Sequence, residues 1–145
     1  MTTGLQAAAE SRTALRQQVI RFAGVGIVST VLHLGLFGLL VVAGMPSQLA
    51  NGLSLVVATV ANTAANRSWT FGVTGRERVV THHGQALLVF AITWAATSAA
   101  LWLLAALEPE AGAAGQTAVV AVANALSTVV RFVAMRSWIF RRDAR

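Results

Sequence analysis

The chain has 145 residues, of which 56% are hydrophobic and 11% are charged, and its mean hydropathy is +0.67. These values exclude a water-soluble single-domain enzyme and indicate a membrane protein. The absence of cysteine excludes disulfides, thiolate zinc sites and thiol nucleophiles. The formal net charge is +6, and all 11 basic residues are arginine. Because they lie beside long apolar runs and not in a basic groove, we predict no nucleic-acid partner.

The first half of the chain contains two apolar runs, at residues 20–43 and about 49–65. The first run is long enough to cross about 30 Å of hydrocarbon. It is longer than the apolar core of a signal peptide and follows a polar stretch, so we predict that it is retained. Residues 44–48 join the two runs and contain Gly44 and Pro46, which favour a turn. The sequence therefore predicts a tight hairpin of two helices.

The second half repeats this layout, with apolar runs at 85–107 and about 117–135 around a turn at 108–112. The last run contains Asn124 and Arg131, and an interfacial helix is its alternative. Apolar residues occur on all its faces, which favours a membrane span. The predicted fold class is all-α, a polytopic membrane protein with four transmembrane helices. We predict a cytoplasmic N-terminal segment at 1–19, a transmembrane domain at 20–140 and a cytoplasmic tail at 141–145.

The distribution of arginine predicts the orientation of these helices. The two hairpin turns contain no basic residue. Cytoplasmic loops collect arginine, so we predict that both termini and the middle loop face the cytoplasm, in the cytoplasmic membrane. Ten of the arginines lie before or in the first turn of the first run, between the second and third, or after the fourth: Arg12, Arg16, Arg21, Arg67, Arg76, Arg78, Arg136, Arg141, Arg142 and Arg145.

A short motif occurs twice in the chain. The pattern R-S-W-x-F is found at 67–71 and at 136–140, each time at the cytoplasmic end of the second helix of a hairpin. Aromatic residues at the membrane interface explain the depth of Trp69 and Trp138, but not the recurring Arg and Ser. We therefore predict two parallel two-helix repeats related by an axis along the membrane normal.

Polar residues fall on one face of three of the predicted helices. Hydrocarbon offers these groups no hydrogen bonds, so the faces should point toward one another or toward a water-filled crevice. Helix-to-helix packing through asparagine is the structural alternative. On a helical wheel the shared positions are Gly26, Ser29, Thr30 and His33; Asn51, Ala58, Asn62, Asn66 and Trp69; and Asn124, Ser127, Thr128, Arg131 and Met135.

Two ionisable residues lie inside the apolar runs, beyond the first turn of each run. Arg131 is roughly two turns from the cytoplasmic end and can snorkel to it. No acidic side chain lies in any run, so an external anion is the other natural partner of Arg131. His33 is either a packing histidine or a proton-coupling group. His82 and His83 lack a third ligand, so we predict no metal site.

The five carboxylates of the chain argue against catalysis. All of them lie outside the four runs, and the hydroxyl residues have no neighbouring base other than His33. We therefore predict that the chain is not an enzyme and holds no cofactor. The carboxylates are Glu10, Glu77, Glu108, Glu110 and Asp143.

Three segments carry a resemblance to a known family: RFAGVG at 21–26, NTAANRSWTF at 62–71 and RFVAMRSWIF at 131–140. From about Gln18 to Phe140 the chain resembles the GtrA-like family of small four-span membrane proteins. The resemblance implies a role in moving polyprenyl-phosphate-linked sugars, or in supporting the glycosyltransferases that use them, and extends to actinobacterial members linked to decaprenyl-phosphate arabinose. Two departures are Met135, where an equivalent of Asn66 is expected, and His33, where the family often has an acidic residue.

These observations predict a substrate-binding crevice that is open to the cytoplasm. Arginine holds the phosphate through its planar fork, and asparagine holds the sugar hydroxyls. The bilayer takes up the prenyl tail. Four short helices enclose little volume, so a homodimer is the alternative to a monomeric pathway. A non-transporting adaptor for a glycosyltransferase is the alternative function, whereas a cation exporter lacks its membrane carboxylate. The predicted site residues are His33, Asn62, Asn66, Arg67, Asn124, Arg131 and Arg136.

Overall fold

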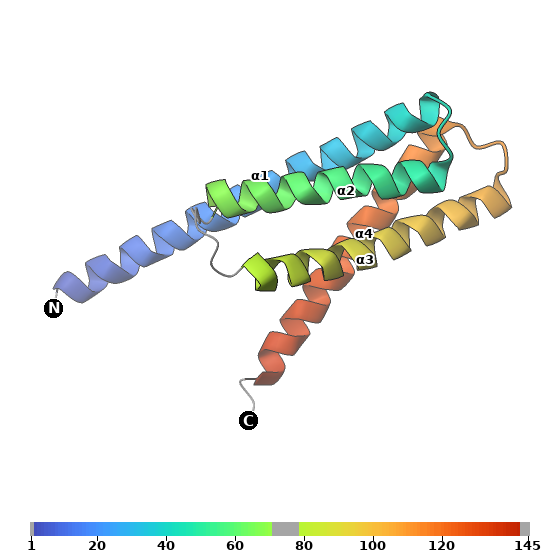
Figure 1. Cartoon of the computed structure of the whole chain (residues 1–145). Helices are drawn as coiled ribbons and strands as arrows, with labels where there is room; N and C mark the ends of the chain where they lie inside the picture. The colour runs from blue at the N-terminus through green and yellow to red at the C-terminus, as the bar shows by residue number, and fades with distance from the viewer. Residues whose placement is uncertain (1, 71–78, 143–145) are drawn as a thin grey trace.

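The computed structural model describes the backbone of residues 2–70 and 79–142, and the side chains of residues 6, 10–69 and 86–130. Every element within the described residues is helical, which confirms the predicted all-α class for that part of the chain (Figure 1). The elements are α1 (Thr2–Val42), α2 (Ser47–Ala65), the π-helical turn η1 (Asn66–Thr70), α3 (Val79–Leu107) and α4 (Ala113–Arg142).

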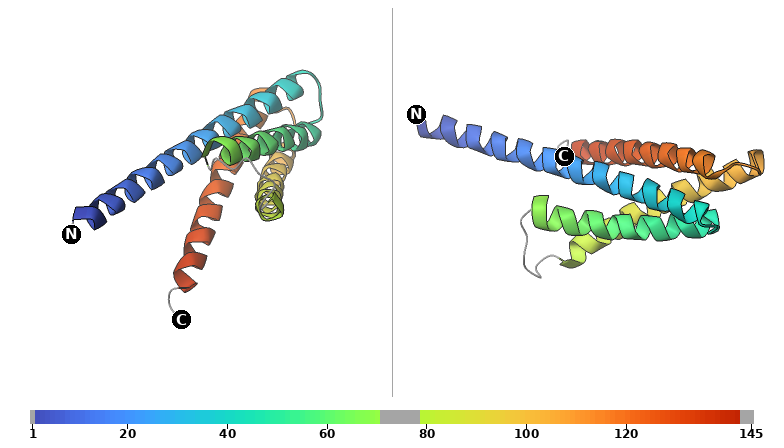
Figure 2. Two further views of the ribbon diagram at one scale, coloured as in Figure 1. Left: turned by 60° about the vertical axis from the view of Figure 1, so that its left-hand side comes forward. Right: turned by 90° about the horizontal axis from the view of Figure 1, so that it is seen from above.

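Helix α1 is longer than the predicted first span. It contains 41 residues and begins at Thr2, so most of the predicted N-terminal segment is helical and continuous with the span. Residues 5–19 are rich in Ala, Leu, Gln and Arg and contain neither Gly nor Pro, which favours this extension. The N-terminal part of α1 projects beyond the other helices (Figures 1 and 2).

The predicted turn after the first helix is present and has a defined hydrogen-bond pattern. The Met45 N–H donates to the Leu40 carbonyl at 2.9 Å, and the Gly44 N–H donates to the Val41 carbonyl at 3.0 Å. These two bonds form a Schellman motif, which requires a left-handed residue. Gly44 occupies that position with φ of 90°. Pro46 then precedes the first residue of α2, and the chain reverses direction.

The four helices form a ring in which each packs on two neighbours. Helix α1 packs on α2, α2 on α3, α3 on α4 and α4 on α1. Both hairpin turns lie at the same end of the bundle (Figure 2). Near that end the buried core receives one residue from each helix, namely Phe37, Ala50, Leu101 and Val120. The turns and this apolar layer therefore hold the four helices together at one end.

Among the described residues, three helical segments are long and apolar enough to cross a membrane: Glu10–Val42 in α1, Ala86–Leu107 in α3 and Ala113–Val130 in α4. The segment of α4, for which an interfacial helix was the alternative, is among them. Helix α2 is not, because Gln48, Asn51 and Asn62 lower the hydropathy of its 19 residues. The chain is thus a multi-pass membrane protein, and the span predicted at about 49–65, in α2, remains a prediction.

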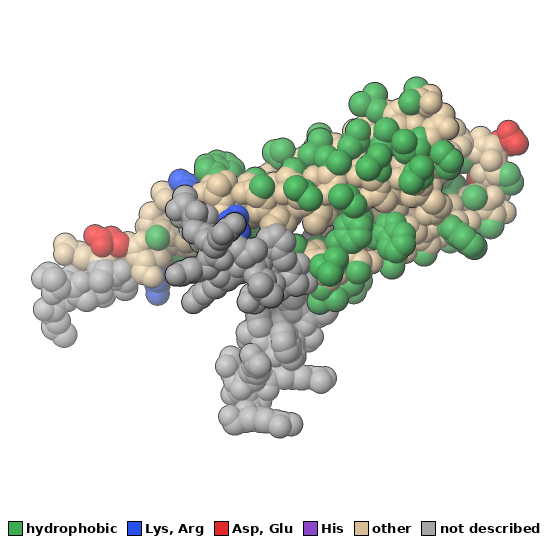
Figure 3. Space-filling model, in the orientation of Figure 1, with side chains coloured by type: hydrophobic (Ala, Val, Ile, Leu, Met, Phe, Trp, Pro, Cys, Tyr) green, Lys and Arg blue, Asp and Glu red, His purple; other side chains and the backbone are tan. Residues whose placement is uncertain are grey.

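Large apolar side chains cover the outside of the bundle. Figure 3 shows them over the end of the molecule that carries the turns, and they continue along all four helices. Leu39, Val42 and Leu107 are 69%, 76% and 70% exposed, respectively. Exposed apolar surface of this extent fits contact with lipid.

The two predicted repeats correspond to the hairpins α1–α2 and α3–α4. They differ at their motifs. The first R-S-W-x-F copy begins in η1, whereas the backbone of the second copy continues as α-helix in α4 to Arg142. The rotation that would relate the two hairpins remains a prediction.

Candidate functional site

Polar side chains from all four helices meet in one network inside the bundle. His33 of α1, Asn51 of α2 and Thr97 of α3 are buried, with exposed fractions of 1%, 0% and 0%. Ser98 of α3 and Asn124 of α4 are half-buried beside them. We call these five residues the four-helix polar network. The inward positions recur every three or four residues along each helix, so the network lies next to the apolar core layer.

Asn51 connects the other members of the network. Its Nδ2 donates to Thr97 Oγ1 at 2.8 Å and to Ser98 Oγ at 3.3 Å. Its Oδ1 lies 3.3 Å from His33 Nε2, and Asn124 Nδ2 lies 3.5 Å from His33 Nδ1. This arrangement fits a neutral imidazole with its proton on Nε2, which donates to Asn51 and accepts from Asn124. A single buried amide thus links three helices directly and the fourth through the histidine.

Further hydrogen bonds join Thr97 of the network, and Ser54 next to it, to backbone carbonyls. The Thr97 hydroxyl donates to the Thr93 carbonyl at 2.8 Å, and the Ser54 hydroxyl donates to the Ala50 carbonyl at 2.7 Å. Among the described residues, every buried side-chain nitrogen and oxygen has a hydrogen-bond partner. The network therefore satisfies its own polar groups at a level where lipid could not.

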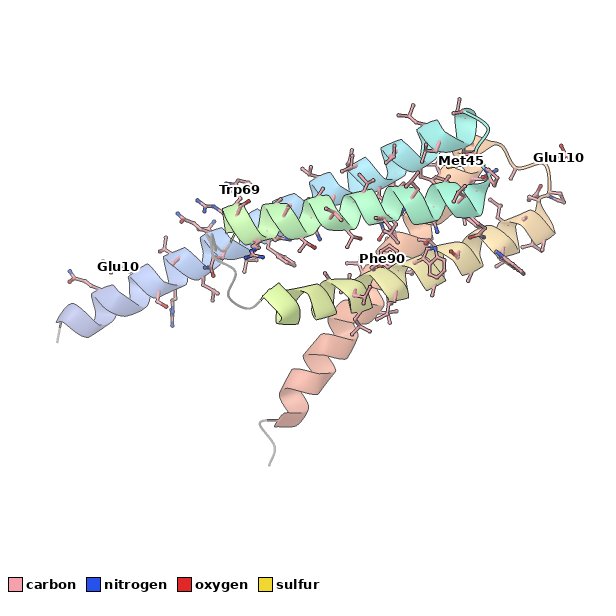
Figure 4. All side chains as sticks on the ribbon, viewed as in Figure 1. Glu10, Met45, Trp69, Phe90 and Glu110 are labelled. Atoms are coloured by element: carbon pink, nitrogen blue, oxygen red, sulfur yellow. The ribbon has the colours of Figure 1, made fainter. Side chains whose placement is uncertain are left out.

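A second group of polar residues lies at the far end of α2, where Figure 4 labels Trp69. Arg21 Nη1 of α1 donates to the Trp69 carbonyl at 3.2 Å, and its guanidinium carbon lies 5.8 Å from the centre of the Trp69 ring. Asn66 Nδ2 donates to Asn62 Oδ1 at 2.9 Å. Arg67 is half-buried in η1. We call these five residues the inner-end cluster, because the distribution of arginine predicts that this end faces the cytoplasm.

The π-helical turn explains how Arg21 reaches α2. A π-helical turn changes the backbone hydrogen-bonding pattern at the end of a helix, and such turns occur often at functional sites. The turn presents the Trp69 carbonyl to α1, which packs on η1. The Arg21 guanidinium binds this carbonyl and lies over the indole ring, so it fixes the end of α2 against α1.

The structure distributes the predicted site residues over two levels. His33 and Asn124 belong to the four-helix polar network, and Asn62, Asn66 and Arg67 belong to the inner-end cluster. The 11 positions between Asn51 and Asn62 correspond to about 16 Å along a helix. The side chains of the remaining two predicted residues, Arg131 and Arg136, lie outside the described residues.

Sequence reasoning left five of the participating residues out of the predicted site. Asn51 and Trp69 lay on the predicted polar face of the second run but were not assigned to the site, and Arg21 was only a topology signal. Thr97 and Ser98 were not placed on a polar face. A stripe of Thr93 and Thr97, four positions apart on an apolar helix, is the signal that indicates an inward polar face. Nothing local in the sequence indicates that Arg21 contacts the Trp69 backbone, 48 positions away.

Cavities among the described residues include one at the hairpin turns and one between α3 and α4. One, of about 480 Å³, lies between the hairpin turns and is bordered by α2, α3, α4 and the 108–112 turn. The other, of about 290 Å³, is an apolar groove between α3 and α4. Within the described residues no group of three or more His, Asp or Glu side chains is placed to hold a metal ion.

Comparison with known proteins identifies the family. The family model described as GtrA/DPMS, transmembrane domain, matches residues 21–141, which include both polar groups described above. No curated protein and no solved structure matches the chain. The match covers most of the chain and confirms the resemblance carried by the segments at 21–26, 62–71 and 131–140. This chain belongs to the GtrA/DPMS transmembrane-domain family.

Proposed function

We propose that this chain moves a polyprenyl-phosphate-linked sugar across the cytoplasmic membrane, for the synthesis of cell-surface or cell-wall polysaccharide. Membership of the GtrA/DPMS family supports a membrane function related to lipid-linked sugars. The four-helix polar network is the observation that carries the proposal. It places neutral amide, hydroxyl and imidazole groups inside a membrane protein, and these groups match the hydrogen-bonding capacity of sugar hydroxyls.

The hydrogen bonds between residues of the network can be replaced by hydrogen bonds to a substrate. Interhelical hydrogen bonds in membrane proteins contribute about 0.6 kcal/mol each on average. Replacing the Asn51–Thr97 or His33–Asn124 bond by a bond to a sugar hydroxyl therefore costs little free energy. A network of weak, replaceable bonds can admit a sugar without leaving buried groups unpaired.

The charged part of the substrate requires different residues. We assign the phosphate to Arg67, Arg131 and Arg136 at the cytoplasmic end, because guanidinium groups bind phosphate oxygens in pairs. Asn62 and Asn66 would contact the sugar next to that phosphate, since they lie half-buried within about one and a half turns of Arg67. The prenyl tail stays in the bilayer along the apolar outer surface.

A second function, a non-transporting adaptor for a glycosyltransferase, is favoured by one observation. Each buried side-chain polar atom in the described residues already has a partner inside the chain. An interior satisfied in this way suits a rigid scaffold, whose exposed apolar helices would contact the transferase. Neither function involves catalysis by this chain. The partner of a translocase would be the lipid-linked sugar, and the partner of an adaptor would be the glycosyltransferase.

Reconstitution of the purified chain alone distinguishes the two functions. Liposomes are loaded on both leaflets with a short-chain prenyl-phosphate arabinose, and an impermeant oxidant then consumes the accessible sugar. A translocase gives complete oxidation, whereas protein-free liposomes give about half, because only the outer leaflet is accessible. Protein that is folded by circular dichroism yet leaves the inner half intact contradicts translocation and supports the adaptor. The mass of the protein–detergent complex separates monomer from homodimer.

A further inference from the structure

The cavity of about 480 Å³ lies at the end of the bundle opposite the inner-end cluster. It is bordered by the first turn of α2, the last turns of α3 and the first turn of α4, near Met45 and Glu110 in Figure 4. Its volume lies within the range of about 300–1,000 Å³ that is usual for small-ligand sites. In the topology predicted from the arginines, this end faces away from the cytoplasm.

The polar groups of the cavity are held in fixed positions. The Ser47 hydroxyl donates to Gln116 Oε1, and Gln116 Nε2 donates to the Ala111 carbonyl at 2.9 Å. Gln48 Nε2 donates to the Ser98 carbonyl at 3.1 Å. These bonds join the first turns of α2 and α4 and orient both amides at the cavity wall. Fixed amide and hydroxyl groups of this kind give a site specificity for hydrogen-bonding ligands.

The Gln48 bond also connects the cavity to the four-helix polar network. Ser98 receives Gln48 on its backbone carbonyl and Asn51 on its hydroxyl, at 3.1 Å and 3.3 Å. Gln48 and Asn51 are three positions apart on α2, so they lie on one face of that helix. Polar groups thus continue from the network to the cavity along adjacent turns of α2 and α3.

The charges around the cavity exclude phosphate as its main ligand. Among the described residues that line it, Glu108 is the one ionisable side chain, and no arginine is present. A carboxylate repels a phosphate and accepts hydrogen bonds from hydroxyls. Trp102 adds a large flat apolar surface that is 73% exposed. An aromatic face, two fixed amides and a carboxylate together suit an uncharged, hydroxyl-rich ring.

We propose that this cavity is the outer binding site for the sugar moiety of the lipid-linked substrate. The inference rests on the proposed translocation, because it assigns the cavity to the outer end of the pathway, which the sugar reaches after it has passed the network. Trp102 packs against the C–H face of the sugar ring, while Gln48, Gln116 and Glu108 bind its hydroxyls. The phosphate remains outside the cavity, at the level of the outer lipid head groups.

Binding to the full chain in lipid nanodiscs tests this site, because both faces of the protein are then accessible. The probes are a short-chain prenyl-phosphate arabinose and the same prenyl phosphate without sugar. Trp102→Ala should weaken binding of the sugar-bearing probe roughly 2- to 12-fold, the equivalent of about 0.5–1.5 kcal/mol for an aromatic contact. The sugar-free probe should bind wild type and variant alike. Folding is spared because Trp102 is largely exposed.

Trp94→Ala is the matched control. Trp94 is a second tryptophan of α3, is 47% exposed, stacks on Phe90 and does not line the cavity. It should leave the binding of both probes unchanged. If Trp102→Ala binds the sugar-bearing probe as tightly as wild type, the cavity is not the sugar site, and translocation in liposomes still stands. Equal weakening of the sugar-free probe assigns the cavity to the prenyl phosphate and also overturns the proposal. A wild-type chain that binds no sugar-bearing probe overturns this site together with the proposed function.

Discussion

The four-helix polar network and the inner-end cluster contain similar residue types but are packed differently. In the network, buried His33, Asn51 and Thr97 bond across helices, and all four helices contribute. In the cluster, Asn66 bonds to Asn62 within one helical stretch, and Trp69 is 57% exposed. The same amide side chain thus joins helices at one level and lies at a helix edge at the other.

The arrangement of the helices explains this difference. Helices α3 and α4 are close at their shared turn and diverge toward their other ends, as both figures of the whole ribbon show (Figures 1 and 2). Near the turns each polar residue finds partners on neighbouring helices, whereas α4 stands apart from α3 at the level of the cluster. We infer that the network end is the more stable part of the bundle, and the proposed function assigns the first binding of the lipid-linked substrate to the inner end.

The largest expected effect concerns which of the two regions faces the cytoplasm. Because the chain has no native cysteine, single cysteines at Ser11, Thr74, Glu110 and Gly112 can be labelled without background. In intact cells an impermeant maleimide should label Glu110→Cys and Gly112→Cys only, since the arginine-free turns are predicted to face outward. Labelling of Thr74→Cys in intact cells would reverse the assignment of inner and outer ends.

The second prediction concerns charge at the inner end. Arg67→Gln and Arg131→Gln should each weaken binding of a prenyl-phosphate sugar roughly 10- to 150-fold, because a charge-assisted hydrogen bond contributes about 1.5–3 kcal/mol. Titration of the purified variants in nanodiscs measures this loss. Arg141→Gln, in the predicted tail and outside the proposed site, is the control and should bind nearly as wild type. If Arg131→Gln inserts, folds and binds normally, Arg131 is a snorkelling residue only.

The third prediction tests the difference in packing directly. Asn51→Leu removes the partner of His33 Nε2 and the donor to Thr97 and Ser98, so it should lower the free energy of unfolding by about 1–3 kcal/mol. Asn62→Leu, on the same helix and of the same chemistry, should cost less than about 1 kcal/mol, because Asn62 is half-buried. Titration of the detergent-solubilised variants with denaturant, with circular dichroism as the signal, measures both losses. Equal losses would mean that the two levels are packed alike.

Much of the fold could be predicted from sequence because its signals are local. Apolar runs and the Gly44–Pro46 and Pro109 turns specify the hairpins, and Gly44 does adopt the left-handed conformation that ends α1. The extension of α1 to Thr2 was not predicted, since a polar helix in this position carries no hydrophobic signal. Nor was η1, because a π-helical turn depends on how the end of α2 meets α1.

The candidate site was less accessible to sequence reasoning. The inward position of Asn51 follows from the helical wheel, and the structure confirms it with an exposed fraction of 0%. Its partners Thr97 and Ser98 do not follow, because the pairing of residues 46 and 47 positions apart depends on how far α2 and α3 are shifted along each other. The separation of the predicted residues into two levels also reflects this three-dimensional register, which periodicity within one helix does not contain.

The smallest expected effect concerns Arg21, the residue that α1 contributes to the inner-end cluster. Arg21→Gln removes the hydrogen bond to the Trp69 carbonyl and the contact with the indole ring, at a partly solvated site. The loss should be about 0.5–1 kcal/mol, which lowers Tm by roughly 1–4 °C. Arg12→Gln, an exposed arginine of the same helix, should leave Tm unchanged and so controls for the lost charge. If Arg21→Gln instead weakens binding of the prenyl-phosphate sugar as strongly as Arg67→Gln, Arg21 contacts the phosphate itself and α1 belongs to the ligand-binding part of the inner end. Retention of full binding with a lowered Tm would show that Arg21 only positions η1, so that the ligand-binding part of the inner end is confined to α2, η1 and α4.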